Sequence, residues 1–189
     1  MMKRTVGICA LLLAGLFAGA HACAQSPESA SGGDARLTVG GDINATYLGY
    51  GKRWIGGGGA SVDANMNWRW GVEGESNFTF YRAYADTHST TFLGGPRYQL
   101  NAFGSDYRYR PYVKILAGLG QFNFPYNYGH GSYFVYAPGA GVDYRLNYHW
   151  RLRLFDFEAQ EWPQFSFDGV HTYNLANYTL TTGVRYNLR

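Results

Sequence analysis

The residues of this chain that could support metal or acid–base chemistry are scattered along the sequence. The five histidines are His21, His88, His130, His149 and His171. No two of them have the spacing of metal ligands on one face of a helix or strand. The last four, together with Asp86 and Ser89, fall in segments that we expect to be polar loops or turns. We therefore predict no catalytic residue, no metal site and no cofactor, and a protein that is not an enzyme.

The charged residues follow a stricter pattern, because many of them occupy one face of segments in which polar and apolar residues alternate. The acidic members of this face are Asp42, Asp63, Glu73, Glu75 and Asp143, joined by Asp156 and Glu158 if a β-bulge at Leu154–Phe155 restores the alternation. The basic members are Arg97, Lys114, Arg145, Arg151, Arg153 and Arg185. Seven acidic side chains nearly balance six basic ones. Because buried charges must be paired, this balance predicts a network of ion pairs inside the protein.

The elements that would position these charges are β-strands. Period-two alternation recurs in eight segments between residues 36 and 188. Each segment is close to the roughly 9–11 residues that a tilted strand needs to cross a bilayer. The shorter connections are 67–69, 101–109 and 146–149, and the longer ones are 50–57, 82–89, 121–132 and 160–173. Three turns and four loops predict an all-β fold, an eight-stranded antiparallel up-and-down barrel with both termini at one end.

Glycine and proline bear on how regular these strands are. Pro96 and Pro138 each lack an N–H for the sheet ladder, so we expect them at bulges or strand ends. No Lys-Ser/Thr follows Gly56–Gly59, as a phosphate loop would need, so we predict a flexible loop there. The interior of an eight-stranded barrel is about filled by its own side chains. Small water pockets are expected at four inward glycines, Gly40, Gly118, Gly139 and Gly141.

Alternation alone does not say which face looks inward, because a soluble lipocalin-like binding barrel and a membrane barrel share the same period. The aromatic residues of the apolar face favour the membrane. One group lies near the short turns and contains Trp70, Tyr98, Tyr144, Trp150 and Tyr186. The other lies towards the longer loops and contains Tyr47, Phe80, Phe92, Phe134, Phe157 and Tyr178. Two aromatic belts match the two interfaces of a bilayer, so we predict a transmembrane β-barrel surrounded by outer-membrane lipid.

Composition narrows the class further. Aromatic residues make up 18% of the chain and charged residues 15%. That mixture excludes a disordered chain, and the presence of only three lysines argues against a helical bundle. The net charge of +3 comes without a cluster of basic residues, so we expect no nucleic-acid binding.

The N-terminus has the three-part pattern of a secretory signal peptide. A positive start is followed by an uncharged, mostly apolar run over 6–20 and by small residues up to Ala24. The predicted organisation is a signal peptide at 1–24, a flexible leader at 25–34 and an outer-membrane barrel at 35–189. Cleavage would remove Cys9 and Cys23, so no disulfide would stabilise the exported chain.

The C-terminal segment resembles the β-signal of outer-membrane barrels. Thr181, Gly183, Tyr186 and Leu188 occupy its polar, glycine, aromatic and hydrophobic positions, although the chain ends in Arg189 where an aromatic residue is common. The segments 95–97, 110–112, 141–145 and 150–153 are similar to strand patterns of OmpA-like outer-membrane β-barrel domain proteins, a porin-like family. The resemblance covers residues 35–189. It implies the barrel domain alone, a Gram-negative outer membrane, and recognition of the C-terminal strand by the barrel-assembly machinery.

These patterns predict the kind of protein better than its role. The leading hypothesis is a small, monomeric outer-membrane barrel with a structural or surface-interaction role and no catalysis. The aromatic segments 121–132 and 162–173 are candidate surfaces for an extracellular ligand, unless their rings extend the outer belt. The alternatives are a narrow ion or solute channel, a soluble lipocalin-like binding barrel, and an outer-rim lipid-modifying enzyme. Lipid A palmitoyltransferases, which place His, Asp and Ser at the outer rim, suggest the last of these.

Overall fold

The computed structural model describes residues 37–67, 69–81, 87–123, 130–166 and 173–188. The chain divides into two compact units, residues 1–33 and 34–189, and the described residues all belong to the second. The predicted signal peptide at 1–24 and leader at 25–34 therefore lie outside the described residues and stay predictions. Among the described residues, no helix is long and apolar enough to span a membrane.

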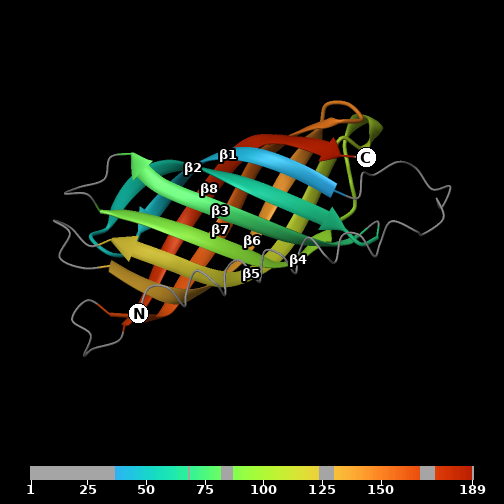
Figure 1. The fold of residues 1–189 in the computed structure, drawn as a ribbon. Helices are drawn as coiled ribbons and strands as arrows, with labels where there is room; N and C mark the ends of the chain where they lie inside the picture. Colours follow the sequence, from blue (N-terminus) through green and yellow to red (C-terminus); the bar gives the residue numbers. More distant parts are fainter. Residues whose placement is uncertain (1–36, 68, 82–86, 124–129, 167–172, 189) are drawn as a thin grey trace. The chain divides into compact units, whose positions relative to one another are not determined.

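Eight antiparallel strands form a closed barrel, in which each strand pairs with its neighbours in sequence and the last pairs with the first (Figure 1). The strands are β1 (Leu37–Leu48), β2 (Arg53–Asn65), β3 (Trp70–Tyr81), β4 (His88–Gln99), β5 (Tyr109–Asn123), β6 (His130–Arg145), β7 (Trp150–Phe165) and β8 (Tyr173–Leu188). A short 3₁₀ helix, η1 (Ser105–Tyr107), lies between β4 and β5. The predicted eight-stranded up-and-down barrel is confirmed.

The connections at the barrel end away from the short turns are shorter than the sequence indicates. The predicted loop 50–57 is a turn over residues 49–52, with Gly51 and Lys52 at positive φ, and Gly56–Gly59 lies inside β2. The segments 121–123 and 160–165 likewise belong to β5 and β7. Glycine has no side chain and so contributes no alternation to the pattern. A Cβ at Gly59 would lie 2.6 Å from Oδ1 of Asn77 on β3, so this glycine serves strand packing rather than loop flexibility.

The predicted bulge in β7 is present. The pairing of β7 with β6 and with β8 shifts by one residue after Arg153, and Leu154 and Phe155 are both exposed on the outer face. Asp156 and Glu158 are therefore turned inward, where they are fully buried. One extra residue in the strand thus keeps the alternation of faces intact on both sides of the bulge.

Pro96 and Pro138 do not lie where the sequence predicts. Pro96 is inside β4, where Gly94 pairs with Ala117 and Arg97 with Lys114 without a shift in register. Pro138 is inside β6 and pairs with Ile115. Neither residue marks a bulge or a strand end. A proline removes an N–H from one ladder only, and Pro96 still pairs with Val72 on the other side.

The inner and outer faces of the barrel have opposite chemistry. Large apolar side chains such as Ile43, Ile115 and Leu119 are exposed on the outside, whereas Thr, Asn, Asp, Glu, Lys and Arg side chains are buried inside. A soluble lipocalin-like barrel would have the reverse arrangement, which excludes that alternative. The exposed apolar side chains of the outer face are suited to an apolar surrounding such as the hydrocarbon of a membrane.

Candidate functional site

A layer of charged side chains fills the barrel interior near the end that carries the short turns. Asp63, Arg97 and Asp143 each lie two residues from the last residue of β2, β4 or β6. Glu73 of β3 and Arg185 of β8 lie three residues from the same end of the barrel. All five side chains are buried. The alternation brings these charges to one face, and closure of the sheet brings that face together from five strands.

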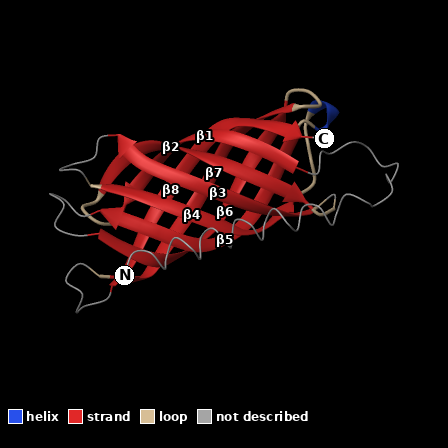
Figure 2. Ribbon diagram, in the orientation of Figure 1, coloured by secondary structure: helices blue, strands red, loops and turns tan. Residues whose placement is uncertain are grey.

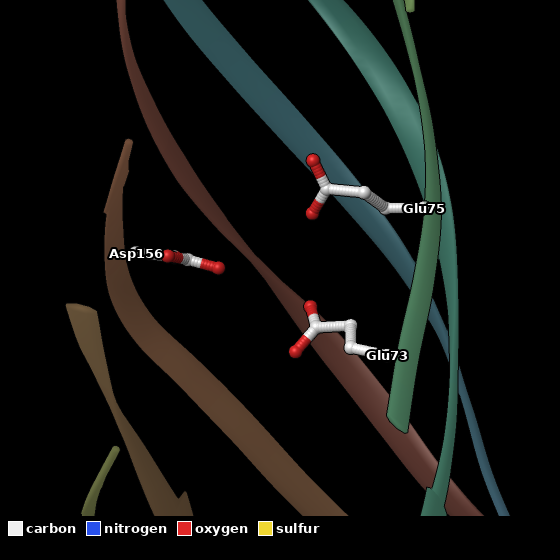
Figure 3. Close-up of side chains that lie close together, drawn as sticks. All are labelled: Glu73, Glu75 and Asp156. Atoms are coloured by element: carbon white, nitrogen blue, oxygen red, sulfur yellow. The ribbon is translucent and has the colours of Figure 1, made fainter. Parts of the chain in front are cut away.

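Lys114 is the central cation of this layer. Its Nζ lies 2.6 Å from carboxylate oxygens of Asp156 and Glu158, 2.9 Å from Glu75 and 3.3 Å from Glu73. The carboxylates of Glu73, Glu75 and Asp156 face one another across the interior (Figure 3), with oxygens within 4.8 Å, close enough to share a metal ion. The Lys114 ammonium is hydrogen-bonded to all three and so supplies the positive charge that a metal would bring.

Three arginines connect the remaining carboxylates. Arg97 donates to Asp63 at 2.8 Å and to Asp143 at 2.6 Å. Arg153 donates to Glu73 at 2.6 Å and pairs with Asp156 at 2.8 Å, and Arg185 donates to Asp63 and, at 3.1 Å, to Glu73.

The ring of Tyr112 packs against this arginine group. The Arg97 guanidinium carbon lies 3.7 Å from the Tyr112 ring centroid, a cation–π contact. Each charge thus has several partners, as burial of ionised groups requires.

The remaining predicted interior charges, Asp42, Arg145 and Arg151, have other surroundings. Asp42 accepts a hydrogen bond from the Ser61 hydroxyl at 2.8 Å. Arg151 is buried and lies opposite Arg145 and Arg185 in the sheet register. Arg145 is half-buried at the rim, where it donates to the backbone oxygen of Asp106 at 3.0 Å. Arg97, Lys114, Arg153 and Arg185 are thus the basic side chains whose ion pairs with the interior carboxylates are described above.

The inward glycines make room for these side chains rather than for water. A Cβ at Gly141 would lie 2.5 Å from the Tyr112 hydroxyl, and one at Gly139 would lie 3.2 Å from Cε of Lys114. A Cβ at Gly40 would lie 3.1 Å from Cγ of Arg185. At these three positions the expected water pocket is instead occupied by the side chain of the residue paired with the glycine on the adjacent strand, and at Gly118 a Cβ would collide with the Phe92 backbone oxygen of β4.

An apolar cluster closes the interior at the opposite end. Its buried members are Leu48, Ile55, Leu93, Leu116, Phe122, Val135, Ala137, Trp162 and Phe165, with Tyr50, Tyr133 and Leu175 packed against them. Trp162 is 0% and Phe122 1% exposed, and the Phe122 ring lies 6.3 Å from Trp162 and 5.2 Å from Phe165, edge on in both cases. We call these twelve residues the apolar plug.

The apolar plug corrects the prediction for two aromatic segments. Phe122 and Trp162 belong to β5 and β7 and point into the barrel, so they are neither a loop surface nor part of the outer belt. Every second residue from Lys114 and Leu116 onward faces the interior, and this alternation extends to Phe122. The alternation could therefore have indicated from the sequence that Phe122 points inward. The sequence analysis did not predict this, because an apolar residue on the polar face interrupts the alternation and was interpreted as the end of the strand. The aromatic residues at 124–129 lie outside the described residues.

Comparison with known proteins identifies the family. The sequence model of a protein family, the outer membrane protein beta-barrel domain, matches residues 9–187 of this chain. The chain belongs to this outer-membrane β-barrel family. No curated protein matches it significantly.

The solved structures show that the fold is shared across low sequence identity. Neisserial surface protein A is 12% identical with a TM-score of 0.61, covering 82% of this chain and 98% of that one. The N-terminal β-barrel domain of Pseudomonas aeruginosa OprF is 12% identical with a TM-score of 0.54, covering 82% of this chain and 100% of that one. Outer membrane protein OprG from the same organism is 12% identical with a TM-score of 0.50, covering 82% of this chain and 97% of that one. At this identity the likeness concerns the fold alone.

The aromatic residues on the lipid-facing side of this family member gather at both ends of its strands. Trp70 packs edge on against Tyr98 at 4.8 Å, and Trp150 packs against Tyr186 at 4.9 Å, at the end of the short turns. Towards the other end Tyr178 stacks at 6.1 Å on Phe157, which lies in the middle of β7. Trp54 joins this second group through Tyr47 at 5.4 Å, and the sequence reasoning missed it because it placed 50–57 in a loop.

The residues of the predicted β-signal lie at the seam that closes the barrel. Thr181 and Gly183 of β8 pair with Asn44 and Asp42 of β1, and the same register places Tyr186 opposite Val39 and Leu188 opposite Leu37. A Cβ at Gly183 would collide with the Asp42 side chain and the Gly41 carbonyl. Gly183 therefore allows β1 and β8 to approach each other.

The residues considered for an outer-rim enzyme do not come together in the described structure. His88 and Ser89 are the first two residues of β4, not loop residues, and they point to opposite faces. Ser89 is buried, and its hydroxyl shares a hydrogen bond with that of Thr79 at 2.8 Å. His149 lies in a turn at the far end and stacks on Tyr186 at 5.7 Å. Asp86 and His171 lie outside the described residues, as does the side chain of His130.

Proposed function

We propose that this chain is a closed, non-conducting outer-membrane barrel whose role is structural or is carried out by its exposed surface, without catalysis. The observation that carries the proposal is the filled interior. Membership of the outer-membrane β-barrel family supports the location, and the exposed apolar face suits a lipid environment.

Two levels of side chains support the closed state. Lys114, Arg153, Arg185 and Tyr112 are fully buried at the charged level, and the apolar plug fills the level nearest the other end. An ion crossing the barrel would have to separate buried ion pairs at the first level and lose its hydration at the second. Both steps are costly in a medium of low dielectric constant, so a narrow channel is the weaker hypothesis.

The first prediction tests conductance. Purified chain inserted into planar lipid bilayers is expected to give no steady single-channel current, because large side chains fill both levels. A double variant, Tyr112→Ala with Trp162→Ala, removes one large side chain from each level and should conduct more than the unchanged chain. A steady current through the unchanged chain would contradict the proposal and favour the channel.

A role at the cell surface is the finer part of the proposal. A filled lumen leaves the membrane-facing exterior and the connections at the two ends as the parts that can contact other molecules. One structural neighbour is described as a Neisserial surface protein, and the aromatic residues at 124–129 remain the candidate surface for an extracellular ligand. Export by residues 1–24, a monomeric state and recognition by the assembly machinery through Thr181–Leu188 complete the proposal.

A further inference from the structure

The barrel end with the short turns is rich in arginine outside the buried charge layer. Arg69, Arg108 and Arg145 lie on its turns or strand ends, and Asp106 is the one acidic residue in the described parts of these turns. Figure 2 shows η1, which contains Asp106, at the end of the barrel where β8 ends. This end therefore carries an excess of positive charge next to one of the two aromatic belts.

Arg69 is held against the belt by an outward-facing tyrosine. Its Nη1 donates to the Tyr98 hydroxyl at 2.8 Å and its Nη2 donates to Oδ1 of Asn101 at 3.1 Å. The guanidinium carbon lies 5.9 Å from the Tyr98 ring centroid. Tyr98 itself packs against Trp70. The charge thus lies at the level of rings that prefer the interface between lipid tails and headgroups.

Arg108 repeats this arrangement on the next turn. The interaction with Tyr144, more than that with Asp106, raises the pKa of Arg108 above its ordinary value. Tyr144 packs against Tyr109 at 5.0 Å, and Tyr109 stacks on Phe103 at 5.3 Å. The Arg108–Asp106 pair spans 3.4 Å with both side chains exposed, so it neutralises Arg108 weakly.

The backbone of the β4–β5 turn is shaped to present Arg108. Asp106 and Tyr107 have left-handed conformations with φ of 56° and 52°, which are unfavourable for residues other than glycine. Arg145 holds this shape, because its side chain donates to the Asp106 oxygen at 3.0 Å and its backbone N–H donates to the Arg108 oxygen at 2.9 Å. Strain maintained by tertiary contacts is typical of functional positions.

We propose that the two pairs, Arg69–Tyr98 and Arg108–Tyr144, bind the phosphate groups of anionic phospholipids in the leaflet that faces the short turns. The guanidinium fork matches a phosphate, and the belt rings place it at headgroup depth. The inference rests on the membrane location given under Proposed function. It extends the general expectation of a lipid partner to a headgroup class and to named residues.

Spin-label electron paramagnetic resonance tests the proposal on the full chain in phosphatidylcholine vesicles. The measured quantity is the preference of the inserted protein for spin-labelled phosphatidylglycerol over spin-labelled phosphatidylcholine. Removing both charges, with Arg69→Gln and Arg108→Gln, should lower this preference by roughly five-fold for each arginine, the equivalent of about 1 kcal/mol per interfacial charge. Tyr98→Phe with Tyr144→Phe keeps both charges but removes the positioning hydroxyls, and it should lower the preference by less.

A matched control removes two charges from the opposite end, with Lys52→Gln and Arg53→Gln, and should leave the preference nearly unchanged. Heat-dependent gel mobility identifies folded protein, and the tyrosine pair serves as the test if the arginine variant does not fold. Unchanged preference in the test variants, or an equal loss in the control, would overturn the proposal. So would displacement of the labelled lipid by inorganic phosphate beyond the effect of chloride at equal ionic strength, which would indicate a site for soluble phosphate.

This result and the conductance result are independent. Lipid preference is measured on barrels that are already inserted, so its loss leaves the closed-barrel proposal standing. A conducting barrel could equally retain its preference for anionic lipid.

Discussion

At the scale of single residues, the interior is organised around one lysine and one glutamate, each with four partners of opposite charge. Lys114 contacts four carboxylates from β3 and β7, whereas each of these carboxylates has other partners or neighbours. Glu73, for example, also pairs with Arg97, Arg153 and Arg185. A barrel interior cannot move these charges into water without opening the sheet. The lysine is therefore a structural cation.

The prediction at this scale concerns Lys114→Met, which keeps the length of the side chain and removes its charge. It should lower the free energy of unfolding by about 3–5 kcal/mol, because it leaves buried carboxylates without their shared cation. Urea unfolding in lipid vesicles, followed by tryptophan fluorescence, measures the change. Lys52→Met, at an exposed position of the 49–52 turn, is the control, and equal stability of the two variants would show that Lys114 is not needed for the interior.

At the scale of elements, the bulge in β7 shows how a strand keeps its faces. Arg153 and Asp156 both point inward, although two residues that are three apart would point to opposite faces in a regular strand. The extra residue is Leu154, and both neighbouring strands shift their pairing at the same place. Two apolar residues in succession are tolerated because both lie on the lipid-facing side.

This arrangement predicts that two single-residue deletions in β7 differ sharply. Deleting Leu154 restores regular alternation and leaves Arg153 and Asp156 inside, so the barrel should still fold. Deleting Leu152 forces Arg153 outward. The cost is at most the roughly 2–4 kcal/mol of an arginine at the bilayer midplane and is smaller at the level of Arg153 near the short turns, but the loss of its ion pairs adds to it. Heat-dependent gel mobility after refolding into vesicles reports the folded fraction, and similar folding of both deletions would refute this account of the bulge.

At the scale of the whole molecule, closure of the sheet creates the interior. The seam between β1 and β8 joins the two ends of the barrel unit, and Gly183 lies where the strands approach closely, with its Cβ position 2.8 Å from Cα of Asp42. Asp42 in turn accepts a hydrogen bond from Ser61 of β2, so the residues at the seam are connected to the buried side chains of the interior. A barrel with an open seam would expose unpaired backbone groups to lipid.

A larger side chain at the seam is expected to oppose closure. Gly183→Val should lower the folded fraction and the amount in the outer membrane, because the added atoms collide with Asp42 and the Gly41 carbonyl. Gly41→Val is the matched control in the neighbouring strand, since a Cβ there meets no atom within 4 Å. Cell fractionation with heat-dependent mobility measures both. Normal assembly of Gly183→Val would show that the seam has room to adjust.

Much of the fold was predictable because its determinant is local. Period two follows from the strand itself, so residues such as Asp63 and Glu73 reveal which face they share without reference to any other strand. The same periodicity predicted the β7 bulge from Leu154 and Phe155. Loop lengths were less predictable, since glycines such as Gly57 and Gly59 contribute no pattern while the ladder still extends through them.

The sequence by itself thus determined the strand number, the lipid-facing side and the charged character of the interior. Only the tertiary structure decided that Lys114 is shared by four carboxylates, that Arg145 lies at the rim, and that Phe122 and Trp162 point inward to form the apolar plug. The physical reason is that the side of the sheet on which a residue lies depends only on its position along its own strand. The side chains that it contacts across the interior depend instead on how the eight strands stagger when the sheet closes. Side chains that meet across the lumen come from residues far apart in the sequence, and no local period relates them.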